Sequence, residues 1–150
     1  MADIKERLRL YEGSLDYQKY KGYYKNGKFW TYKDSLGYPT IGYGHLVQKG
    51  EDFSNGLTPI EADILLAHDI EKAKAELRTL NLGTLPTDIE DYLIIMIFQL
   101  GLAGTSKFKK LLAAAKIGDR DGIRRESKDS LWYKQTKSRV DDMNNQLKWK

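Results

Sequence analysis

The chain has 150 residues, of which 41% are hydrophobic and 31% are charged, and its formal net charge is +4. These values are typical of one soluble globular domain with a sizeable core, and they exclude a disordered tail. The absence of cysteine excludes a disulfide scaffold and thiolate catalysis, and it leaves the redox compartment undecided. The basic residues are scattered, so a solvated surface explains the charge better than contact with nucleic acid.

Residues 3–13, DIKERLRLYEG, predict a short helix. Asp3 is a suitable N-cap, and Gly13 ends the apolar pattern of the helix. Glu12 therefore lies at the C-terminal end, where the helix dipole disfavours a carboxylate. This position is consistent with a functional glutamate and also with an ordinary solvated one.

Residues 22–46 predict a small antiparallel sheet of about three strands. Asn26 and Gly27 lie between aromatic and β-branched runs, which is the usual signal of a two-residue type I′ hairpin. Residues 34–37 begin with Asp and end with Gly, so they predict a second turn. The chain then returns as a strand, with Pro39 at its start or on an edge.

A long helix is predicted over about residues 58–82, followed by further helices. Thr58 and Glu61 form a capping box, and Pro59 falls at the first helical position. After Pro86 the pattern predicts helices over 87–100, about 105–116, about 119–126 and 130–147. The predicted class is α+β, with the chain forming a single domain. Its parts are a sheet lobe over about 13–57, the connecting helix, and a helical lobe over about 83–150 that also includes the N-terminal helix 3–12.

Two carboxylates, Glu12 and Asp34, are candidate catalytic residues. A cleft between two lobes can hold a polymer, with Glu12 and Asp34 flanking it. Glycosidic cleavage uses such a pair, because one carboxyl donates a proton to the leaving oxygen and the other activates water or attacks. An Asp at the first position of a turn more often binds only the turn backbone. The pattern by itself leaves both interpretations open.

Three motifs resemble those of the phage-type lysozymes, the muramidases with which tailed bacteriophages cut host peptidoglycan. The first is Glu12-Gly13 followed by YKDSLGYPTIGYGHL at 32–46; the others are IFQLG at 97–101 and SLWYKQTKSR at 130–139. They occur in the family's order and span nearly the whole chain. The resemblance implies a lysozyme-like fold and hydrolysis of the β-1,4 bond between N-acetylmuramic acid and N-acetylglucosamine. No cofactor and no metal are implied.

The resemblance also implies catalytic roles. Glu12 would be the general acid, and Asp34 and Thr40 would position the attacking water. Inversion at the anomeric carbon is implied too, an outcome that depends on the separation of the two carboxyls. The 21 residues between Glu12 and Asp34 exceed the short family form, and Asp16 is nearer to Glu12, but only Asp34 carries the downstream motif. The aromatic residues of this insertion either lengthen the glycan groove or cover the sheet.

Further positions match residues that support the site. Arg139 matches the arginine that meets the catalytic glutamate, and we expect it to orient Glu12. A nearby cation favours the ionised carboxylate, whereas a general acid must keep its proton, so the two physical effects oppose each other. Leu46 and Phe98 are expected to line the saccharide groove, although either is also suited to the core.

Two pairs are expected to be structural. His45 would bind Asp69 on the long helix, and this explains the histidine better than a role as base or metal ligand. His68 is expected on the helix surface, so the chain offers no zinc site built from imidazoles. Gln99 and Trp132 match an internal pair of the family, for which structural support is the expected role.

The expected partner is bacterial cell-wall peptidoglycan. Neither nucleic-acid binding nor stable membrane insertion is expected, since the longest apolar run, 92–98, is too short to span a bilayer. We expect a monomer that stays in the host cytoplasm until it is released to the cell wall, because the charged N-terminus does not resemble a signal peptide.

Several alternatives to a free endolysin stay open. They are a virion tail-associated lysozyme, a non-catalytic wall-binding module of the same fold, and a lytic transglycosylase. The last would need a general acid but not the water-positioning pair of Asp34 and Thr40.

Overall fold

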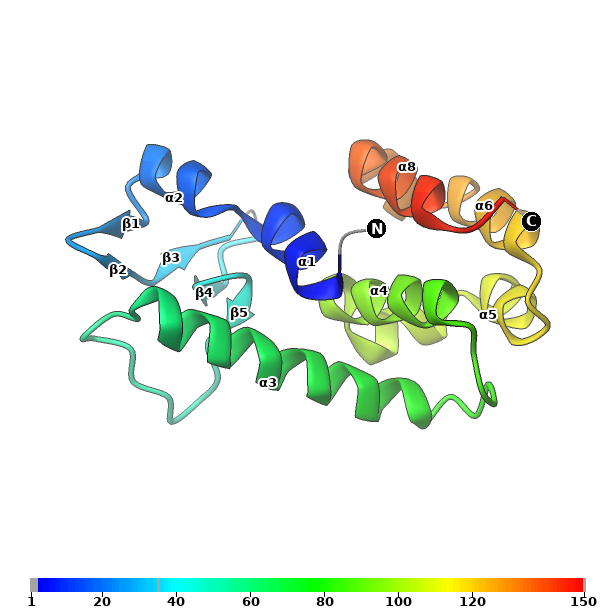
Figure 1. Ribbon diagram of the computed structural model, residues 1–150, viewed down its shortest axis with the longest axis horizontal. Helices are drawn as coiled ribbons and strands as arrows, with labels where there is room; N and C mark the ends of the chain where they lie inside the picture. The colour runs from blue at the N-terminus through cyan, green and yellow to red at the C-terminus, as the bar shows by residue number, and fades with distance from the viewer. Residues whose placement is uncertain (1–2, 35, 150) are drawn as a thin grey trace. The chain divides into compact units, whose positions relative to one another are not determined.

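The structure, a computed structural model, describes residues 3–34 and 36–149 (Figure 1). The chain divides into two compact units, Met1–Glu71 and Lys72–Lys150. The first unit holds small sheets and helices, and the described part of the second is helical, so the predicted α+β class is confirmed. The N-terminal helix groups with the sheets rather than with the helical lobe to which the sequence assigned it.

The first unit begins with two consecutive helices, α1 (Ile4–Glu12) and α2 (Leu15–Lys21). The first was predicted, and Asp3 caps it as expected. The second was not, because its aromatic residues favoured an extended hairpin. Ser14 caps α2 by accepting a hydrogen bond from the Tyr17 N–H at 3.2 Å, and Gly22 ends it in the left-handed conformation. The first part of the insertion between Glu12 and Asp34 is therefore a helix that was not predicted.

A tight hairpin follows α2. Strands β1 (Tyr24–Lys25) and β2 (Lys28–Phe29) pair in antiparallel fashion. Asn26 and Gly27 have φ angles of 56° and 75°, which confirms the predicted type I′ turn.

A separate three-stranded antiparallel sheet consists of β3 (Tyr32–Lys33), β4 (Pro39–Ile41) and β5 (His45–Leu46), in that order. The single sheet predicted for this region is wrong, because the two hairpins do not join. The Phe29 backbone pairs instead with Leu57, through hydrogen bonds of 2.7 and 2.9 Å, so β2 has no partner in the second sheet. Pro39 starts its strand, where its missing N–H is tolerated.

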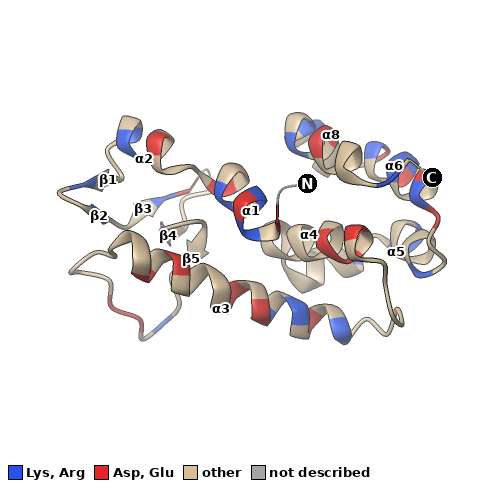
Figure 2. Cartoon of the chain, viewed as in Figure 1, with Lys and Arg blue, Asp and Glu red and all other residues tan. Residues whose placement is uncertain are grey.

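Helix α3 (Pro59–Arg78) begins at the predicted capping box. The Thr58 N–H donates to Glu61 Oε1 at 2.9 Å, and the Glu61 N–H donates to Thr58 Oγ1 at 3.2 Å. These reciprocal bonds satisfy two donors that the first turn leaves unpaired. Acidic residues occur along this helix, whereas its basic residues lie only in the C-terminal half (Figure 2).

The helical unit is built around α4. Its helices are α4 (Thr87–Ser106), α5 (Lys109–Lys116), α6 (Arg120–Lys128), α7 (Leu131–Gln135) and α8 (Lys137–Gln146). Residues 92–97 of α4 are all buried. Among the described helices, α4 is the one long and apolar enough to cross a membrane by length and composition, a test that the core helix of a soluble protein also passes. Gly101 kinks it, with a φ of 75°.

The single helix predicted over 130–147 is wrong, because α7 and α8 are separate. Thr136 lies between them with non-helical angles of −135° and 51°. Its hydroxyl donates to the Trp132 carbonyl oxygen at 2.9 Å. A threonine hydroxyl that bonds a nearby carbonyl group competes with the backbone hydrogen bonds of a helix. The break between α7 and α8 lies at this residue.

A partly buried ion pair stabilises the helical unit. Asp88 accepts hydrogen bonds from Arg120 at 2.7 and 2.8 Å and from the Lys148 N–H at 3.0 Å. The Arg120 guanidinium lowers the pKa of Asp88 to about 2.

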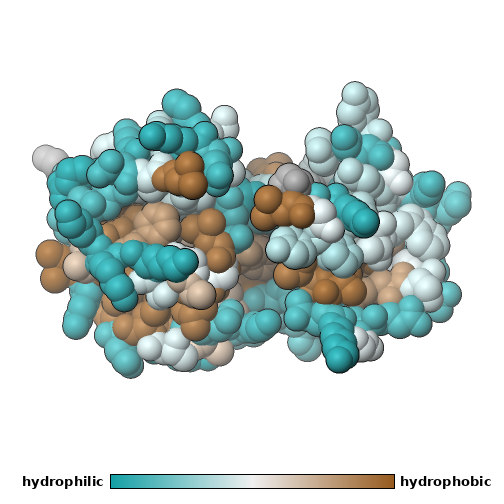
Figure 3. Space-filling view, turned by 180° about the vertical axis from the view of Figure 1, so that it is seen from behind, coloured by the Kyte–Doolittle hydropathy of each residue, from teal (hydrophilic) through white to brown (hydrophobic). Residues whose placement is uncertain are grey.

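The surface is mixed in polarity, and apolar patches interrupt hydrophilic ones on the face shown in Figure 3.

Candidate active site

Glu12 is the last residue of α1, and its surroundings hold it in place. Arg9, one turn earlier, donates to Asp63 of α3 at 3.1 and 2.8 Å, which ties the two helices together. Gly13 then leaves the helix with a φ of 115°. From the sheet side, Gly44 lies so close that a Cβ atom placed there would be 2.9 Å from Glu12 Cβ, Cγ and Oε2. The Glu12 carboxylate is therefore confined between a helix end and a strand turn.

Asp34 begins the turn between β3 and β4. Its Oδ1 atom accepts from the Leu36 and Tyr38 N–H groups, each at 2.9 Å. Both bonds use one carboxylate oxygen, so within the described part of the chain Oδ2 has no hydrogen bond. Ser35, which completes the predicted turn, lies outside the described residues. Asp34 thus binds the turn backbone and still presents one oxygen for chemistry.

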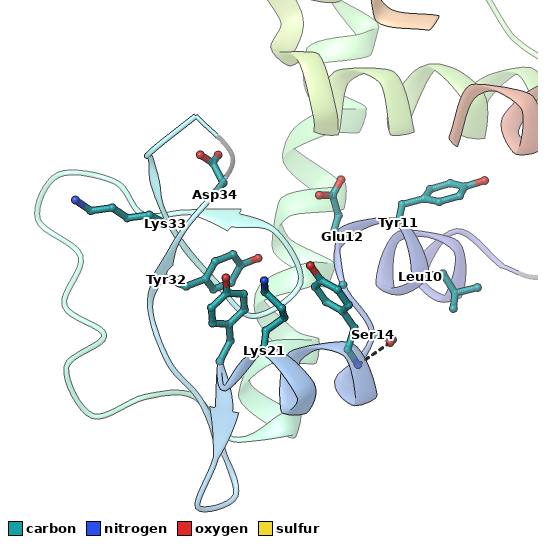
Figure 4. Close-up of a pocket in the computed structure, with 11 residues that line it drawn as sticks. Leu10, Tyr11, Glu12, Ser14, Lys21, Tyr32, Lys33 and Asp34 are labelled. Atoms are coloured by element: carbon teal, nitrogen blue, oxygen red, sulfur yellow. Dashed lines mark hydrogen bonds between the residues drawn. The ribbon is translucent and has the colours of Figure 1, made fainter. Parts of the chain in front are cut away.

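The two carboxylates line one pocket of about 590 Å³ in the first unit. Its lining residues are Leu10, Tyr11, Glu12, Gly13, Ser14, Tyr17, Lys21, Tyr23, Tyr32, Lys33 and Asp34. Figure 4 shows the Glu12 and Asp34 carboxylates pointing to the same side of this pocket, with Tyr32 below them.

The pKa of Tyr32 depends on both carboxylates. Burial raises the pKa of Tyr32 to about 12, and the negative charges of Glu12 and Asp34 add to this effect. The phenol therefore stays protonated at neutral pH, where its hydroxyl can donate a hydrogen bond.

Thr40 lies on β4 directly opposite Tyr32 on one side and Leu46 on the other. Opposed residues of an antiparallel pair share a face, so all three side chains lie on one face of the sheet. Thr40 is buried, its hydroxyl donates to the Tyr38 carbonyl oxygen at 3.1 Å, and it is not among the pocket-lining residues. Leu46 is 45% exposed and also lies outside the pocket lining. The water-positioning role of Thr40 and the groove role of Leu46 stay predictions.

Gln18 connects the two segments that hold the site. Its side-chain Nε2 donates to the Gly13 carbonyl oxygen at 2.9 Å and to the Gly42 carbonyl oxygen at 2.8 Å. Gly13 follows Glu12, and Gly42 belongs to the turn that carries Gly44. Gln18 is 1% exposed, so these bonds lie in the interior, and its Oε1 has no partner among the described residues. Gln18 was not predicted as a site residue, because the helix that carries it, α2, was not predicted.

The predicted contact between His45 and Asp69 is present. His45 Nδ1 lies 2.8 Å from Asp69 Oδ2, and its Nε2 lies 2.9 Å from Glu51 Oε1, a partner that was not predicted. The hydrogen bond to Asp69 raises the pKa of His45, burial opposes it, and Glu51 adds to the rise. Among the described residues, no group of three or more His, Asp or Glu side chains could hold a metal ion.

Four predicted residues belong to the helical unit. Trp132 Nε1 donates to Gln99 Oε1 at 3.0 Å, so the predicted internal pair is present, and Trp132 is 4% exposed. Phe98 and Arg139 are half-buried on α4 and α8. Their predicted roles, groove lining and the orientation of Glu12, stay predictions.

A profile of the phage lysozyme family matches residues 24–147, and the chain therefore belongs to this family. The match includes Asp34, Thr40 and His45 and begins after Glu12. The chain is also similar to the pre-baseplate central spike protein Gp5 of Enterobacteria phage T4, with 30% identity over 135 residues. That similarity covers 73% of this chain but only 24% of the relative, so the chain spans about a quarter of that protein's length. Family membership supports a glycoside hydrolase-type activity in general.

Proposed function

We propose that this protein is a muramidase that hydrolyses the β-1,4 bond between N-acetylmuramic acid and N-acetylglucosamine in peptidoglycan. The observation that carries the proposal is the shared pocket of Glu12 and Asp34, whose charges both act on Tyr32. Glycosidic hydrolysis needs two carboxyl groups in different environments beside one bond. Glu12 is confined by Gly44, whereas Asp34 is anchored by turn N–H groups through one oxygen.

In the proposed reaction, Glu12 donates its proton to the leaving glycosidic oxygen. Asp34 accepts a proton from a water molecule through its second oxygen, and that water attacks the anomeric carbon from the opposite face. Thr40 assists in holding the water, and Arg139 orients Glu12. The products are then a free reducing end with inverted configuration and a non-reducing sugar.

The test is clearing of Gram-negative cells stripped of their outer membrane. We expect Glu12→Gln to lower the clearing rate by about 10²–10⁴-fold, the usual effect of losing a general acid. Asp34→Asn should be nearly as damaging. Asp16→Asn is the matched control, because Asp16 is exposed on α2 and does not line the pocket. If Asp16→Asn abolished clearing, Asp16 would be the second catalytic carboxylate, and the assignment of Asp34 would be overturned.

Product analysis separates hydrolysis from the other chemistries. A reducing N-acetylmuramic acid end with inverted anomeric configuration in the first minutes, observed by NMR, supports the proposal. An anhydro end would identify a lytic transglycosylase, and binding to cell walls with no cleavage would identify a non-catalytic module.

A tail-associated setting is a second element of the proposal. It is supported by the similarity to a phage protein named for the central spike of the pre-baseplate. A free endolysin that accumulates in the host cytoplasm and lyses the host is the competing setting. Mass spectrometry of purified virions tests it, since a tail component is retained in the particles and a free endolysin is removed with the lysate.

A further inference from the structure

The segment between Glu12 and Asp34, longer than in the short family form, supplies a large part of the pocket wall. Five lining residues lie in the stretch from α2 to β3: Tyr17, Lys21, Tyr23, Tyr32 and Lys33. None of them was predicted as a site residue. Their chemistry is a group of aromatic rings accompanied by ammonium groups, beside the two carboxylates.

The rings form a firm platform. Tyr23 and Tyr32 stack with their centroids 4.0 Å apart and their planes at 4°. Stacking fixes both rings against each other, so they present a rigid apolar surface with polar hydroxyl ends. Tyr17 is 52% exposed on α2 and lines the same pocket. Flat rings with polar ends suit a sugar ring, which has an apolar face and a polar edge.

Lys21 adds a positive charge to this platform. It follows Tyr17 by four residues on α2, so the two side chains share one face of the helix. In Figure 4 its ammonium extends into the pocket toward Tyr32, whereas Lys33 points away from the pocket centre. Within the described part of the chain, no carboxylate forms an ion pair with Lys21. Its charge is therefore available to an anionic ligand.

We propose that α2 and the β1–β3 segment form an additional glycan subsite that selects a muramyl residue carrying its peptide. The sugar ring stacks on Tyr17 and the Tyr23–Tyr32 pair, and a carboxylate of the stem peptide binds the Lys21 ammonium. This subsite rests on the proposed muramidase function and names the part of the peptidoglycan that the pocket recognises. It also gives the insertion a role in substrate selection, next to the bond that is cut.

Binding is measured by calorimetry in the Glu12→Gln background, so that the ligand stays intact. The probes are a tetrasaccharide muropeptide with free peptide carboxylates and the same compound with these carboxylates amidated. We expect Lys21→Met to lower affinity for the free-carboxylate probe by about tenfold, the value of one charge-assisted contact, and to leave the amidated probe unaffected. Lys25→Met is the control, since Lys25 is exposed on β1 outside the pocket.

The aromatic platform has its own matched pair of variants. Tyr17→Ala should lower affinity for both probes by about fivefold. Tyr20→Ala should leave both affinities unchanged, because Tyr20 lies on the same helix, is 86% exposed and does not line the pocket.

The outcomes separate the subsite from the proposed reaction. Equal effects of Lys21→Met on the two probes, or of Tyr17→Ala and Tyr20→Ala, would overturn the subsite even if the wild type cleaves peptidoglycan. A wild type that binds both probes as expected but never cleaves would overturn the muramidase reaction and leave the subsite standing.

Discussion

Gly44 and Glu12 are separated by 31 residues in the chain, yet the backbone of Gly44 occupies the space directly beside the Glu12 side chain. A methyl group at position 44 would lie 2.9 Å from Glu12 Cβ, Cγ and Oε2. Gly44 also has a φ of 81°, which disfavours other residues. The glycine therefore sets the position of the carboxylate that we propose as the proton donor.

Gly44→Ala should lower both stability and activity. The left-handed backbone costs alanine about 1 kcal/mol, and the contact with Glu12 Cβ adds strain that a side-chain rotation cannot relieve. Because Glu12 must shift, we expect kcat to fall by more than about tenfold. Clearing assays and urea denaturation measure the two effects.

Gly50→Ala is the control for this variant, since Gly50 has a φ of 91° and a Cβ atom added there would have no neighbouring atom within 4 Å. It should show the backbone cost alone, with full activity. Equal activities of the two variants would mean that the Gly44 contact does not position Glu12.

The titration of Tyr32 tests whether both carboxylates approach the same phenol. Glu12→Gln and Asp34→Asn should each lower the pKa of Tyr32 from about 12, because each removes a negative charge that disfavours the phenolate. NMR of ring-labelled tyrosine, assigned with Tyr32→Phe, follows the change. Asp16→Asn should leave the titration unchanged. If the pKa of Tyr32 does not change in Asp34→Asn, the Asp34 carboxylate lies too far from Tyr32 and Glu12 for a shared reaction.

Gln18 is expected to act as a positioning residue. Gln18→Met keeps the shape of the side chain but removes the donor shared by the Gly13 and Gly42 carbonyl groups. We expect the free energy of unfolding to fall by about 2 kcal/mol, because two buried hydrogen bonds of about 1 kcal/mol each are lost. We also expect kcat to fall while KM changes little, because α1 and the β4–β5 turn lose their connection. Gln135→Met, at an exposed position on α7, is the control. Reduced stability with unchanged kcat would make Gln18 a purely structural residue.

Local signals in the sequence predicted local structure well. The Thr58–Glu61 capping box and the Asn26-Gly27 turn are both present, since each depends on residues within four positions of each other. Helix α2 also had its signals, Ser14 and Gly22, but the aromatic residues between them favoured strands more strongly. Because that helix was not predicted, the four-residue spacing of Tyr17 and Lys21 could not indicate that their side chains share one helix face.

Features of the site that depend on distant contacts could not be predicted in the same way. The motifs placed Glu12 and Asp34 in one site, but the closeness of Gly44 to Glu12 follows from how the sheet packs against α1. The Gln18 bridge has the same origin. Glu51, the second partner of His45, lies in a segment without a helix or strand pattern, so no periodicity indicated where its side chain would point.

The His45 cluster leads to a prediction about pH. His45 lies between Asp69 and Glu51, and its side chain is 11% exposed. The hydrogen bond to Asp69 raises its pKa above the ordinary value of about 6.5, and the contact with Glu51 adds to the rise. A raised folded-state pKa stabilises the fold fully below about 6.5, and this contribution is lost as pH rises through the higher folded value.

His45→Asn should therefore destabilise the protein most at mildly acid pH, by about 1–2 kcal/mol near pH 5.5 for a pair that is partly buried. Because this contribution is lost as pH rises through the raised folded-state pKa of His45, the difference from wild type should be smaller at pH 9. Urea denaturation at the two pH values measures it, with His68→Asn, at an exposed position on α3, as the control. Equal destabilisation by His45→Asn at both pH values would show that the protonated imidazole does not stabilise the fold. Clearing activity should persist in the variant, because His45 lies outside the pocket lining; a stable but inactive His45→Asn would instead place His45 in the reaction.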